Sequence, residues 1–274
     1  MKQIVAAAGL LLAAAFLAAC SLAPLAAPPA AAPDQEIVVF AAASLTEAFA
    51  ELGAAFTAAH PGVKVTNNFA GSQQLAQQIV SGAPADVFAS ANQKQMQVAV
   101  EGGRIAPEAA QPFVHNRLVV IVPADNAAGI TALSDLARPG VKLVLADASV
   151  PVGQYSLDFL ARADALPDFS AAFSATVLSN VVSYEENVRV VLTKVQLGEA
   201  DAGIVYTSDV TGPARDAVTQ LEIPDALNVI ATYPIAALRD SAHPDRAAEF
   251  VALVLSPEGQ KILAKYGFIP VHSD

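Results

Sequence analysis

The chain has 274 residues, enough for one large domain or two ordinary domains with a packed core. Its single cysteine cannot form a disulfide within the chain, which excludes a disulfide scaffold. The 15 lysines and arginines against 26 aspartates and glutamates give a formal net charge of −11, so nucleic acid is not an expected partner. Although 54% of the residues are hydrophobic, no long uncharged apolar run follows the N-terminal segment, which excludes a protein with several membrane spans.

The N-terminal segment predicts export. Met1-Lys2-Gln3 is a short basic start, Ile4 to Ala19 is rich in alanine and leucine, and Leu17-Ala18-Ala19-Cys20 places small residues before the cysteine. This segment resembles a bacterial lipoprotein signal peptide, which predicts removal of residues 1–19 and lipidation of Cys20. A transmembrane anchor is the alternative, but the apolar stretch is shorter than the about 20 residues that a spanning helix needs.

Residues 20–35 are predicted to be the lipidated cysteine and a tether. The segment is rich in alanine and proline and has no periodic face that a helix or strand could bury. The expected location is therefore outside the cytoplasm, with a lipid anchor holding the protein at the periplasmic or extracellular face of the membrane.

Short apolar runs then alternate with helical patterns over a first block of the chain. Strands are predicted at 37–40, 63–69 and 85–89. Between them, Leu45, Phe49, Leu52 and Phe56 recur at helical spacing, and Leu75, Ile79 and Val80 form a second apolar face. This order predicts parallel strands with helices on both faces of a sheet.

A second block repeats the alternation. Strands are predicted at 118–122, 143–146, 177–182 and 203–206, with helices around Leu157 and Leu160 and over 188–195. Two further helices follow, one with Phe250 and Val254 and one that starts at Pro257. The chain is therefore predicted to be an α/β protein of two lobes, each with a mainly parallel sheet flanked by helices.

Ligands of such folds lie beyond the carboxyl ends of the strands, where helix N-termini present free backbone NH groups. Ser44 and Ser72 follow the first two strands, Val152 and Val188 lie at later helix starts, and Tyr206 ends a strand. Taken alone, Ser44 with Glu47 fits a capping box, and Ser72 fits an ordinary N-cap. The neighbouring Arg189 is expected to be a solvated surface side chain.

Four separated motifs resemble one family. They are Val39-Phe40-Ala41-Ala42-Ala43-Ser44-Leu45, Gly82-Ala83-Pro84-Ala85-Asp86-Val87-Phe88, Gly203-Ile204-Val205-Tyr206-Thr207-Ser208-Asp209 and Lys265-Tyr266-Gly267-Phe268. In this order they are similar to the periplasmic molybdate-binding proteins of ABC importers. The chain departs from that pattern at Gly71, where the family often has a small hydroxyl residue, and at Val152, where alanine is common.

The resemblance implies a periplasmic-binding-protein fold with a ligand cleft between two lobes. The first lobe is expected to comprise residues 36–116 and 234–274 and the second residues 117–233, with crossings near 116–118 and 231–234. It implies that Ser44, Ser72, Val152, Val188 and Tyr206 bind the oxyanion molybdate or tungstate through its oxygens. No protein side chain is expected to bind a metal directly, and no cofactor is expected.

The resemblance also implies partners and leaves alternatives. An ABC permease with its ATPase, the small oxyanion and the membrane through the lipid anchor are the expected partners of a monomeric, non-enzymatic protein. A fully deprotonated oxyanion has only acceptors, so a site made only of donors suits it. Binding of sulfate or of a ferric ion remains open within the same class, and a surface serine hydrolase using Ser44 remains open outside it.

Overall fold

The computed structural model describes residues 35–271. All of them belong to the unit Pro33–Asp274. The predicted signal peptide (1–19), Cys20 and the tether up to residue 34 lie outside the described residues, and Gln35, assigned to the tether, is the first residue of a strand. No helix within residues 35–271 has the length and apolar character needed to cross a membrane.

The first part of the chain forms most of one sheet and its helices. The elements are β1 (Gln35–Ala42), α1 (Thr46–Ala59), β2 (Val63–Ala70), α2 (Ser72–Val80), β3 (Val87–Ala89), α3 (Gln93–Glu101) and β4 (Gln111–Asn116). The C-terminal part returns to this sheet with β10 (Ala231–Ala237), α8 (Pro244–Leu255), α9 (Pro257–Lys265) and β11 (Ile269–Pro270). The strand order is β11-β4-β10-β3-β1-β2.

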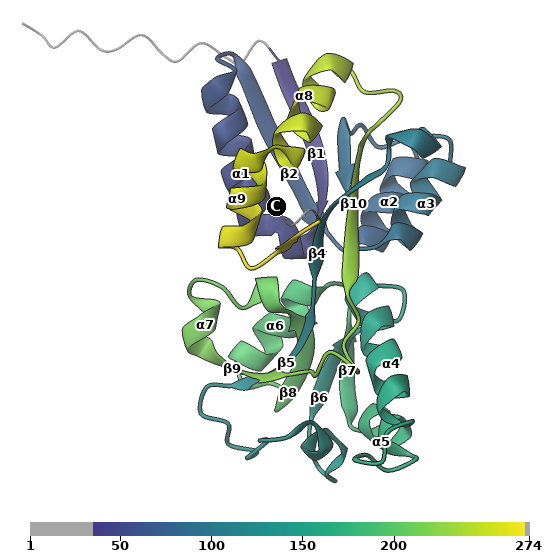
Figure 1. The fold of residues 1–274 in the computed structure, drawn as a ribbon, viewed down its shortest axis with the longest axis vertical. Coiled ribbons are helices and arrows are strands. Elements are labelled where there is room, and N and C mark those ends of the chain that lie inside the picture. The colour runs from purple at the N-terminus through teal and green to yellow at the C-terminus, as the bar shows by residue number, and fades with distance from the viewer. Residues whose placement is uncertain (1–34, 272–274) are drawn as a thin grey trace, which may run out of the picture. The chain divides into compact units, whose positions relative to one another are not determined.

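The middle of the chain forms a second sheet. The elements are β5 (Leu118–Pro123), β6 (Leu143–Ala146), α4 (Pro151–Ala163), α5 (Phe173–Ser179), β7 (Val181–Glu185), α6 (Val188–Gln196), β8 (Ala202–Tyr206), α7 (Ala214–Ala217) and β9 (Val218–Glu222). The strand order is β7-β6-β8-β5-β9. Figure 1 shows helices on both sides of each sheet, with α4 and α5 on one side of the second sheet and α6 and α7 on the other.

The first strand shows how the sequence buries both faces of a sheet. Ile37, Val39 and Ala41 of β1 pack into the larger apolar cluster, while Phe40 packs into a smaller one beneath α2 and α3. Successive side chains of a strand point to opposite faces, so the uninterrupted apolar run of β1 requires a helical layer on each side. In the larger cluster, the ring of Phe49 in α1 packs edge to face against the rings of Phe113 and Phe250, at centroid distances of 5.9 and 6.1 Å.

The two-lobed α/β fold predicted from the sequence is confirmed, and both sheets are mixed. The predicted parallel pairings hold for β1 with β2 and β3, and for β6 with β7 and β8. Strands β4, β10 and β11 add antiparallel pairs to the first sheet, and β5 and β9 add them to the second. The predicted strand 177–182 is wrong in its first part, because Val177 lies in α5 and β7 starts at Val181.

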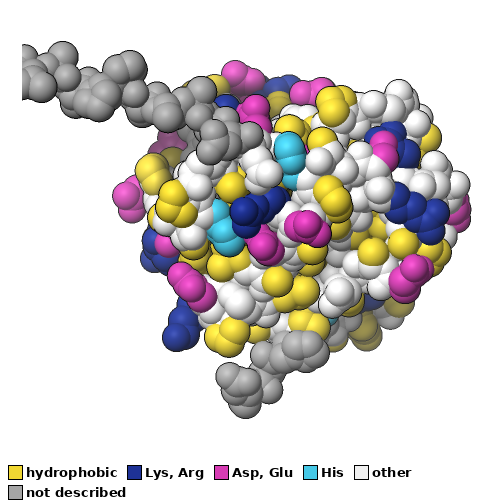
Figure 2. Space-filling view, turned by 90° about the horizontal axis from the view of Figure 1, so that it is seen from above, with side chains coloured by type: hydrophobic (Ala, Val, Ile, Leu, Met, Phe, Trp, Pro, Cys, Tyr) yellow, Lys and Arg dark blue, Asp and Glu magenta, His cyan; other side chains and the backbone are white. Residues whose placement is uncertain are grey.

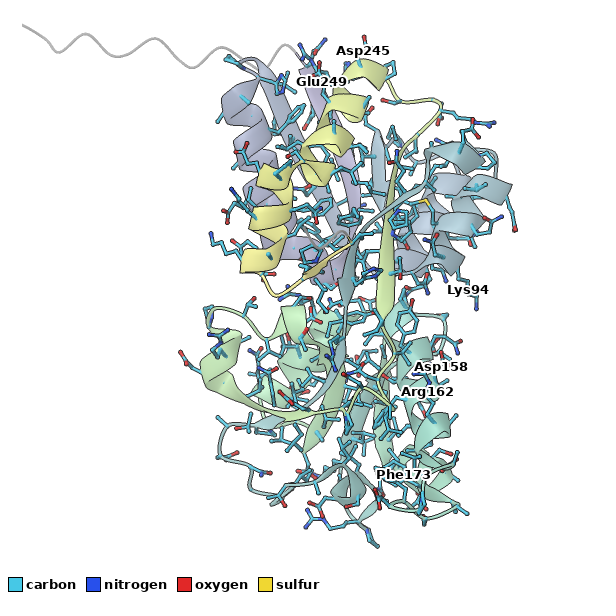
Figure 3. The ribbon with its side chains drawn as sticks, viewed as in Figure 1. Lys94, Asp158, Arg162, Phe173, Asp245 and Glu249 are labelled. Carbon is cyan, nitrogen blue, oxygen red and sulfur yellow. The ribbon has the colours of Figure 1, made fainter. Side chains whose placement is uncertain are left out.

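The chain passes between the sheets twice. The first passage lies between β4, which ends at Asn116, and β5, which starts at Leu118. The second lies between β9 and β10, so residues 231–233, assigned to the second lobe from the sequence, belong to a strand of the first sheet. Arg162 of α4 hydrogen-bonds the carbonyl oxygen of Asn228 within this second connection, and its position on α4 is labelled in Figure 3.

One end of the molecule is seen in the space-filling view. Basic, acidic, histidine and hydrophobic side chains are interspersed on this face, with no broad area of one kind (Figure 2). The face therefore offers neither a basic surface for a polyanion nor a large apolar surface for a partner.

Candidate functional site

One cavity lies where helix starts from both lobes meet. About 10 Å³ of it is open to the centre of a water-sized sphere, and it is lined by Ala42, Ala43, Ser44, Gly71, Ser72, Ala91, Val150, Pro151, Val152, Asn187, Val188 and Tyr206. These residues lie at or just after the carboxyl ends of β1, β2 and β3 in the first sheet and of β6, β7 and β8 in the second. The cavity therefore occupies the position at which open α/β sheets bind ligands. All five residues selected from the sequence, Ser44, Ser72, Val152, Val188 and Tyr206, line it.

The first serine lies in a tight turn between strand and helix. Ser44 is the middle residue of a 3₁₀ turn, Ala43–Leu45, that precedes α1, and its side chain is 3% exposed. The capping alternative is wrong for this residue, because α1 has no side-chain cap and Glu47 bonds elsewhere. The Oγ of Ser44 is instead 2.9 Å from the Oη of Tyr233 in β10.

The second serine is held by the backbone of a neighbouring loop. Ser72 is the first residue of α2, whose N-cap is Gly71, so this serine is not a cap either. The backbone NH of Ala91 donates to the Oγ of Ser72 at 3.0 Å. A serine hydroxyl has one hydrogen. The Oγ of Ser72 donates to no other described residue, so its hydrogen is available at the cavity.

Two helix starts of the second lobe supply backbone NH groups. Asn187 is the N-cap of α6, and its side-chain oxygen accepts from the NH groups of Arg189 and Val190. No hydrogen bond of the NH of Val188 to another described residue is found, so this NH is available at the cavity. Val152 is the second residue of α4 after Pro151, where a helix also lacks internal NH partners.

Close packing fixes the start of α4. A Cβ atom at Gly153 would lie 2.1 Å from the carbonyl oxygen of Asp147 and 2.5 Å from that of Ala146. Only glycine therefore lets the helix approach the end of β6 this closely. At position 152 this chain has a buried valine where the resembling family often has alanine. The expected donor at this position is the backbone NH, which both residues have.

The phenol of Tyr206 is a buried donor without a protein partner. Tyr206 is 1% exposed, and its Oη has no hydrogen-bond partner among the described residues. Burial raises its pKa well above the ordinary value, so the phenol keeps its proton. An unpaired buried polar group is costly. Tyr206 lines the cavity, so this donor is available to a molecule bound there.

A buried carboxyl group lies directly behind this tyrosine. Asp209 is fully buried, and its Oδ2 accepts from the backbone NH of Tyr206 at 3.0 Å. Burial raises the pKa of Asp209 to about 6, although the nearby charge of Arg189 opposes the shift. The Nε of Arg189 lies 3.3 Å from the Oδ1 of Asp209. Asp209 does not line the cavity and acts as the cap of the turn that follows β8.

Arg189 links the two lobes, which corrects its assignment as a solvated surface residue. Its side chain on α6 is only 24% exposed. The guanidinium donates to Glu47 of α1 and, from Nε at 3.2 Å, to the carbonyl oxygen of Ala43. Arg189 is buried by Glu47 and Asp209, which are distant from it in sequence. The residues next to Arg189 in the chain therefore could not predict its burial.

Glutamines make further contacts from the first lobe to the second. Gln73 and Gln74 donate to the backbone oxygen and the carboxylate of Glu186 at 2.9 and 3.0 Å. Gln95 donates to the carbonyl oxygen of Ser149 at 3.2 Å. Together with Arg189 these bonds hold the two walls of the cavity against each other.

Gly71 is required by this close approach. A Cβ atom at this position would lie 2.6 Å from the carbonyl oxygen of Glu186. Its φ of −60° is open to any residue, so the requirement is steric and comes from the opposite lobe. The hydroxyl residue common in the resembling family cannot be accommodated here without moving the lobes apart.

The lining of the cavity defines its chemistry. None of its lining residues is charged, and its polar groups include the hydroxyls of Ser44, Ser72 and Tyr206, the side-chain amide of Asn187 and the NH groups at four helix or turn starts. Helix N-termini favour anions through their NH groups and partial positive charge. Among residues 35–271 no group of three or more His, Cys, Asp or Glu side chains that could hold a metal is found. The arrangement suits a small anion with acceptors only.

Tyr233 and Asn116 were not selected from the sequence. Tyr233 lies in β10, whose Pro234 argues against a strand, and Asn116 ends β4, where polar and apolar residues are mixed. The structure accommodates Pro234 at a shift in register between Tyr233 and Pro234. Neither residue lines the cavity: Tyr233 hydrogen-bonds the lining residue Ser44, and Asn116 hydrogen-bonds Tyr233.

Comparison with known proteins agrees with the fold. The family described as bacterial extracellular solute-binding protein matches residues 37–269. The molybdate-binding proteins ModA of Mycobacterium bovis and Mycobacterium tuberculosis are 40% identical over 234 residues, which cover 85% of this chain and 84% of each relative.

Two solved structures extend the comparison. The substrate-binding domain of a putative molybdenum ABC transporter from Clostridium difficile is 33% identical, with a TM-score of 0.64. The match covers 87% of this chain and 100% of that structure. The sulfate-binding protein SubI of Mycobacterium tuberculosis is 21% identical and shares the fold, with a TM-score of 0.78 and coverage of 86% of this chain and 87% of SubI. The chain belongs to the family of bacterial extracellular solute-binding proteins, and among them it is similar to the molybdate-binding proteins of ABC importers.

Proposed function

We propose that this protein captures molybdate, and also tungstate, in the cavity between its lobes and delivers it to an ABC importer. The observation that carries the proposal is the set of groups at the cavity that can donate hydrogen bonds, three hydroxyls and the NH groups of four helix or turn starts, with no charged side chain among the lining residues. Similarity to ModA proteins over 85% of the chain supports molybdate as the ligand.

The donor set distinguishes between classes of oxyanion. Molybdate, tungstate and sulfate carry no proton at neutral pH, so every ligand oxygen accepts hydrogen bonds. Hydrogen phosphate carries a proton that needs an acceptor, and none of the lining side chains is a carboxylate. A buried donor or acceptor left unpaired costs about 1–3 kcal/mol, which disfavours the protonated anion.

Size separates molybdate from sulfate. Sulfate has the same charge and shape but shorter bonds, so its oxygens cannot reach all the donors of a cavity fitted to molybdate. The resulting unpaired donors oppose sulfate binding. Molybdate and tungstate have nearly the same size, and the same donors serve both.

Binding is proposed to proceed with closure of the two lobes about the two connections between them. The bonds of Arg189 to Glu47 and of Gln74 to Glu186 support this step, because they join the lobes beside the cavity. Small-angle scattering tests closure: the radius of gyration should fall when the ligand saturates the protein, and an unchanged value would contradict closure.

Delivery is proposed to involve an ABC permease and a separate ATPase, which fits a member of the extracellular solute-binding family. Lipidation of Cys20 would hold the protein, as a monomer, at the outer face of the membrane close to that permease. Mass spectrometry of the N-terminal peptide from cells tests the anchor: a diacylglyceryl modification on Cys20 is expected, and an unmodified cysteine would contradict it.

A surface hydrolase using Ser44 is the competing function. A serine nucleophile needs an adjacent base. The partner of Ser44 is the phenol of Tyr233, whose pKa is raised well above its ordinary value by burial, so it does not take up a proton from serine. Ester cleavage by the wild type that disappears in Ser44→Ala would favour the hydrolase.

Calorimetric titration of the full chain in nonionic detergent with molybdate, tungstate, sulfate and phosphate tests the proposal. One-to-one binding of molybdate and tungstate, with little heat from sulfate and phosphate, is the expected result. Binding of sulfate alone would keep capture of an oxyanion but contradict molybdate as the ligand. Absence of binding by all four anions would contradict the proposed function.

A further inference from the structure

Asp209 is a buried carboxyl group that has no direct contact with the cavity. It ends the 3₁₀ turn Thr207–Asp209 after β8, is not among the lining residues, and is 0% exposed. Burial of an ionised carboxylate is costly unless opposite charges and hydrogen bonds surround it. The partners of Asp209 therefore decide which protonation state suits this position.

Two other carboxyl groups within residues 35–271 are buried, and both have strong partners. The two oxygens of Asp86 accept from the NH of Val38 at 2.7 Å and from the hydroxyl of Ser241 at 2.6 Å. Glu185 accepts from the ammonium group of Lys194 at 2.6 Å. Both oxygens of the first carboxylate, and the charge of the second, are thereby satisfied.

Asp209 is less well paired than either of these. Its Oδ2 accepts from the backbone NH of Tyr206 at 3.0 Å, whereas its Oδ1 has no hydrogen-bond partner in the described part of the chain. The Nε of Arg189 lies 3.3 Å from this oxygen, but the hydrogen on Nε is donated to the carbonyl oxygen of Ala43. A proton on Oδ1 would remove a buried charge that lacks a full set of hydrogen bonds.

Charged and titratable groups face Asp209 from four elements. They are Arg189 of α6, Glu47 of α1 and the phenols of Tyr206 in β8 and Tyr233 in β10. Burial raises the pKa of Asp209 to about 6; the charge of Arg189 opposes this shift, and that of Glu47 adds to it. Burial also raises the pKa of both phenols well above the ordinary value. Asp209 can therefore take up a proton near neutral pH, while both phenols keep theirs.

Two contacts connect Asp209 with the wall of the cavity. Tyr206 donates its backbone NH to Asp209 and lines the cavity, and the lining residue Ala43 shares the Nε of Arg189 with Asp209. A dianion in the cavity would place two further negative charges close to this carboxyl group. Nearby like charges favour the neutral form of a carboxyl, and salt screens buried charges only weakly. Occupation of the cavity should therefore increase the affinity of Asp209 for a proton.

We propose that Asp209 is a proton-binding site coupled to the oxyanion site, so that capture of a dianion brings up to one proton onto the Oδ1 of Asp209. The inference rests on the proposed function. The proton comes from the solvent and offsets part of the charge that the lobes enclose. By reciprocity, a proton on Asp209 favours binding of the anion to the same extent. Molybdate affinity should therefore rise as the pH falls from 8 to 6.5.

Proton uptake is measured by calorimetry of the full chain in nonionic detergent at pH 7. Molybdate and tungstate are titrated in Pipes, Hepes and imidazole buffers, whose ionisation enthalpies differ, so the observed heat changes in proportion to the protons taken up. Both anions carry no proton at this pH, so any uptake belongs to the protein. The wild type should take up about 0.4–0.8 proton per bound anion. Binding without uptake would overturn the inference alone.

Asp209→Asn supplies the variant, because its side-chain oxygen can still accept from the NH of Tyr206 but the side chain does not titrate. Its binding of molybdate should be accompanied by no proton uptake, should have equal affinity at pH 6.5 and 8, and at pH 8 should be at least as tight as in the wild type. Wild-type affinity should be about threefold to tenfold higher at pH 6.5 than at pH 8.

Asp164→Asn is the matched control, because Asp164 lies at the end of α4 and outside the cavity. It should keep the proton uptake and the pH dependence of the wild type. If Asp209 only supported the fold, Asp209→Asn would bind more weakly than the wild type at both pH values and would retain the uptake. That result would overturn the inference.

Infrared difference spectroscopy of the wild type gives a second measurement if Asp209→Asn does not fold. Binding of molybdate should produce the carbonyl stretching band of a protonated carboxylic acid, and ¹³C-labelling of aspartate should shift this band. Absence of the band would overturn the inference, because the proton would then reside on another kind of group. Failure of the wild type to bind molybdate or tungstate is a different result, because it contradicts the proposed function itself.

Discussion

Arg189 of α6 and Glu47 of α1 form an ion pair that joins the two lobes beside the cavity. The same guanidinium reaches the carbonyl oxygen of Ala43, the residue before Ser44. The pair therefore connects the contact between the lobes with the turn that carries a proposed ligand residue.

Removing this pair should weaken binding without loss of a direct ligand contact. Glu47→Gln keeps the shape of the side chain but removes its charge. A partly exposed ion pair contributes about 0.2–1 kcal/mol, so we expect an up to about fivefold weaker molybdate affinity, because the closed state becomes less populated. Calorimetry of the variant measures the change.

Glu51→Gln is the matched control on the same helix. Glu51 accepts from Lys265 and Tyr266, which lie in the same lobe, so its loss should leave the affinity unchanged. An equal loss of affinity in both variants would show that Glu47 does not act through the contact between lobes.

A side chain at Gly71 should keep the lobes apart. In Gly71→Ser the added Cβ would meet the carbonyl oxygen of Glu186, while φ of this residue suits serine. Overpacking typically costs about 1–3 kcal/mol, which corresponds to roughly tenfold to a hundredfold weaker binding if it falls on the closed state alone. The thermal midpoint without ligand should change little. Wild-type affinity in this variant would contradict the steric role of Gly71.

The serines and the tyrosine at the cavity should each contribute to ligand binding. Ser44→Ala, Ser72→Ala and Tyr206→Phe each remove one donor to a charged ligand, which should cost about 1–3 kcal/mol of binding free energy. Calorimetry with molybdate measures the three losses. Ser179→Ala serves as a control, because this serine lies at the end of α5 and outside the cavity. Wild-type affinity in both serine variants would contradict the assignment of the site.

The buried carboxyl of Asp209 should give the protein a characteristic pH dependence. Its folded pKa of about 6 lies above the ordinary value of 3.8, so the folded state binds this proton more tightly than the unfolded state. Its contribution to the free energy of unfolding is therefore fully present below pH 3.8 and is lost as the pH rises through 6. The side chain in Asp209→Asn does not titrate, so this variant should not lose stability as the pH rises through 6. Its side-chain oxygen can still accept from the backbone NH of Tyr206.

Chemical denaturation at a series of pH values checks this expectation. Relative to wild type, Asp209→Asn should gain stability between pH 4 and 7, on the order of 2–3 kcal/mol at about 1.4 kcal/mol for each pKa unit. Asp164→Asn is the control, because hydrogen bonds from Ser174 lower the pKa of Asp164 from its ordinary value of 3.8, so its difference from wild type should stay nearly constant between pH 4 and 7. A constant difference between Asp209→Asn and wild type over this pH range would show that Asp209 does not titrate as proposed.

The parallel part of the fold could be predicted because its residues follow simple local patterns. The apolar runs of β1, β6 and β8 and the helix start at Val188 are features of short stretches of sequence. The prediction failed at Val177, because a short apolar run fits a buried helix end as well as a strand. It also missed β10, where Pro234 interrupts the strand pattern and only the register shift beside Tyr233 accommodates it.

The sequence by itself determined the two-lobed α/β class and the residues at the ends of strands and the starts of helices, including Ser44, Ser72, Val152, Val188 and Tyr206. These depend on backbone dihedral preferences and on burial, which neighbouring residues largely set. Only the tertiary structure decided that Tyr233 meets Ser44 and that Arg189 meets Glu47, across 189 and 142 residues. Such contacts depend on the strand order and on how the two lobes meet, and no local pattern of residues specifies either.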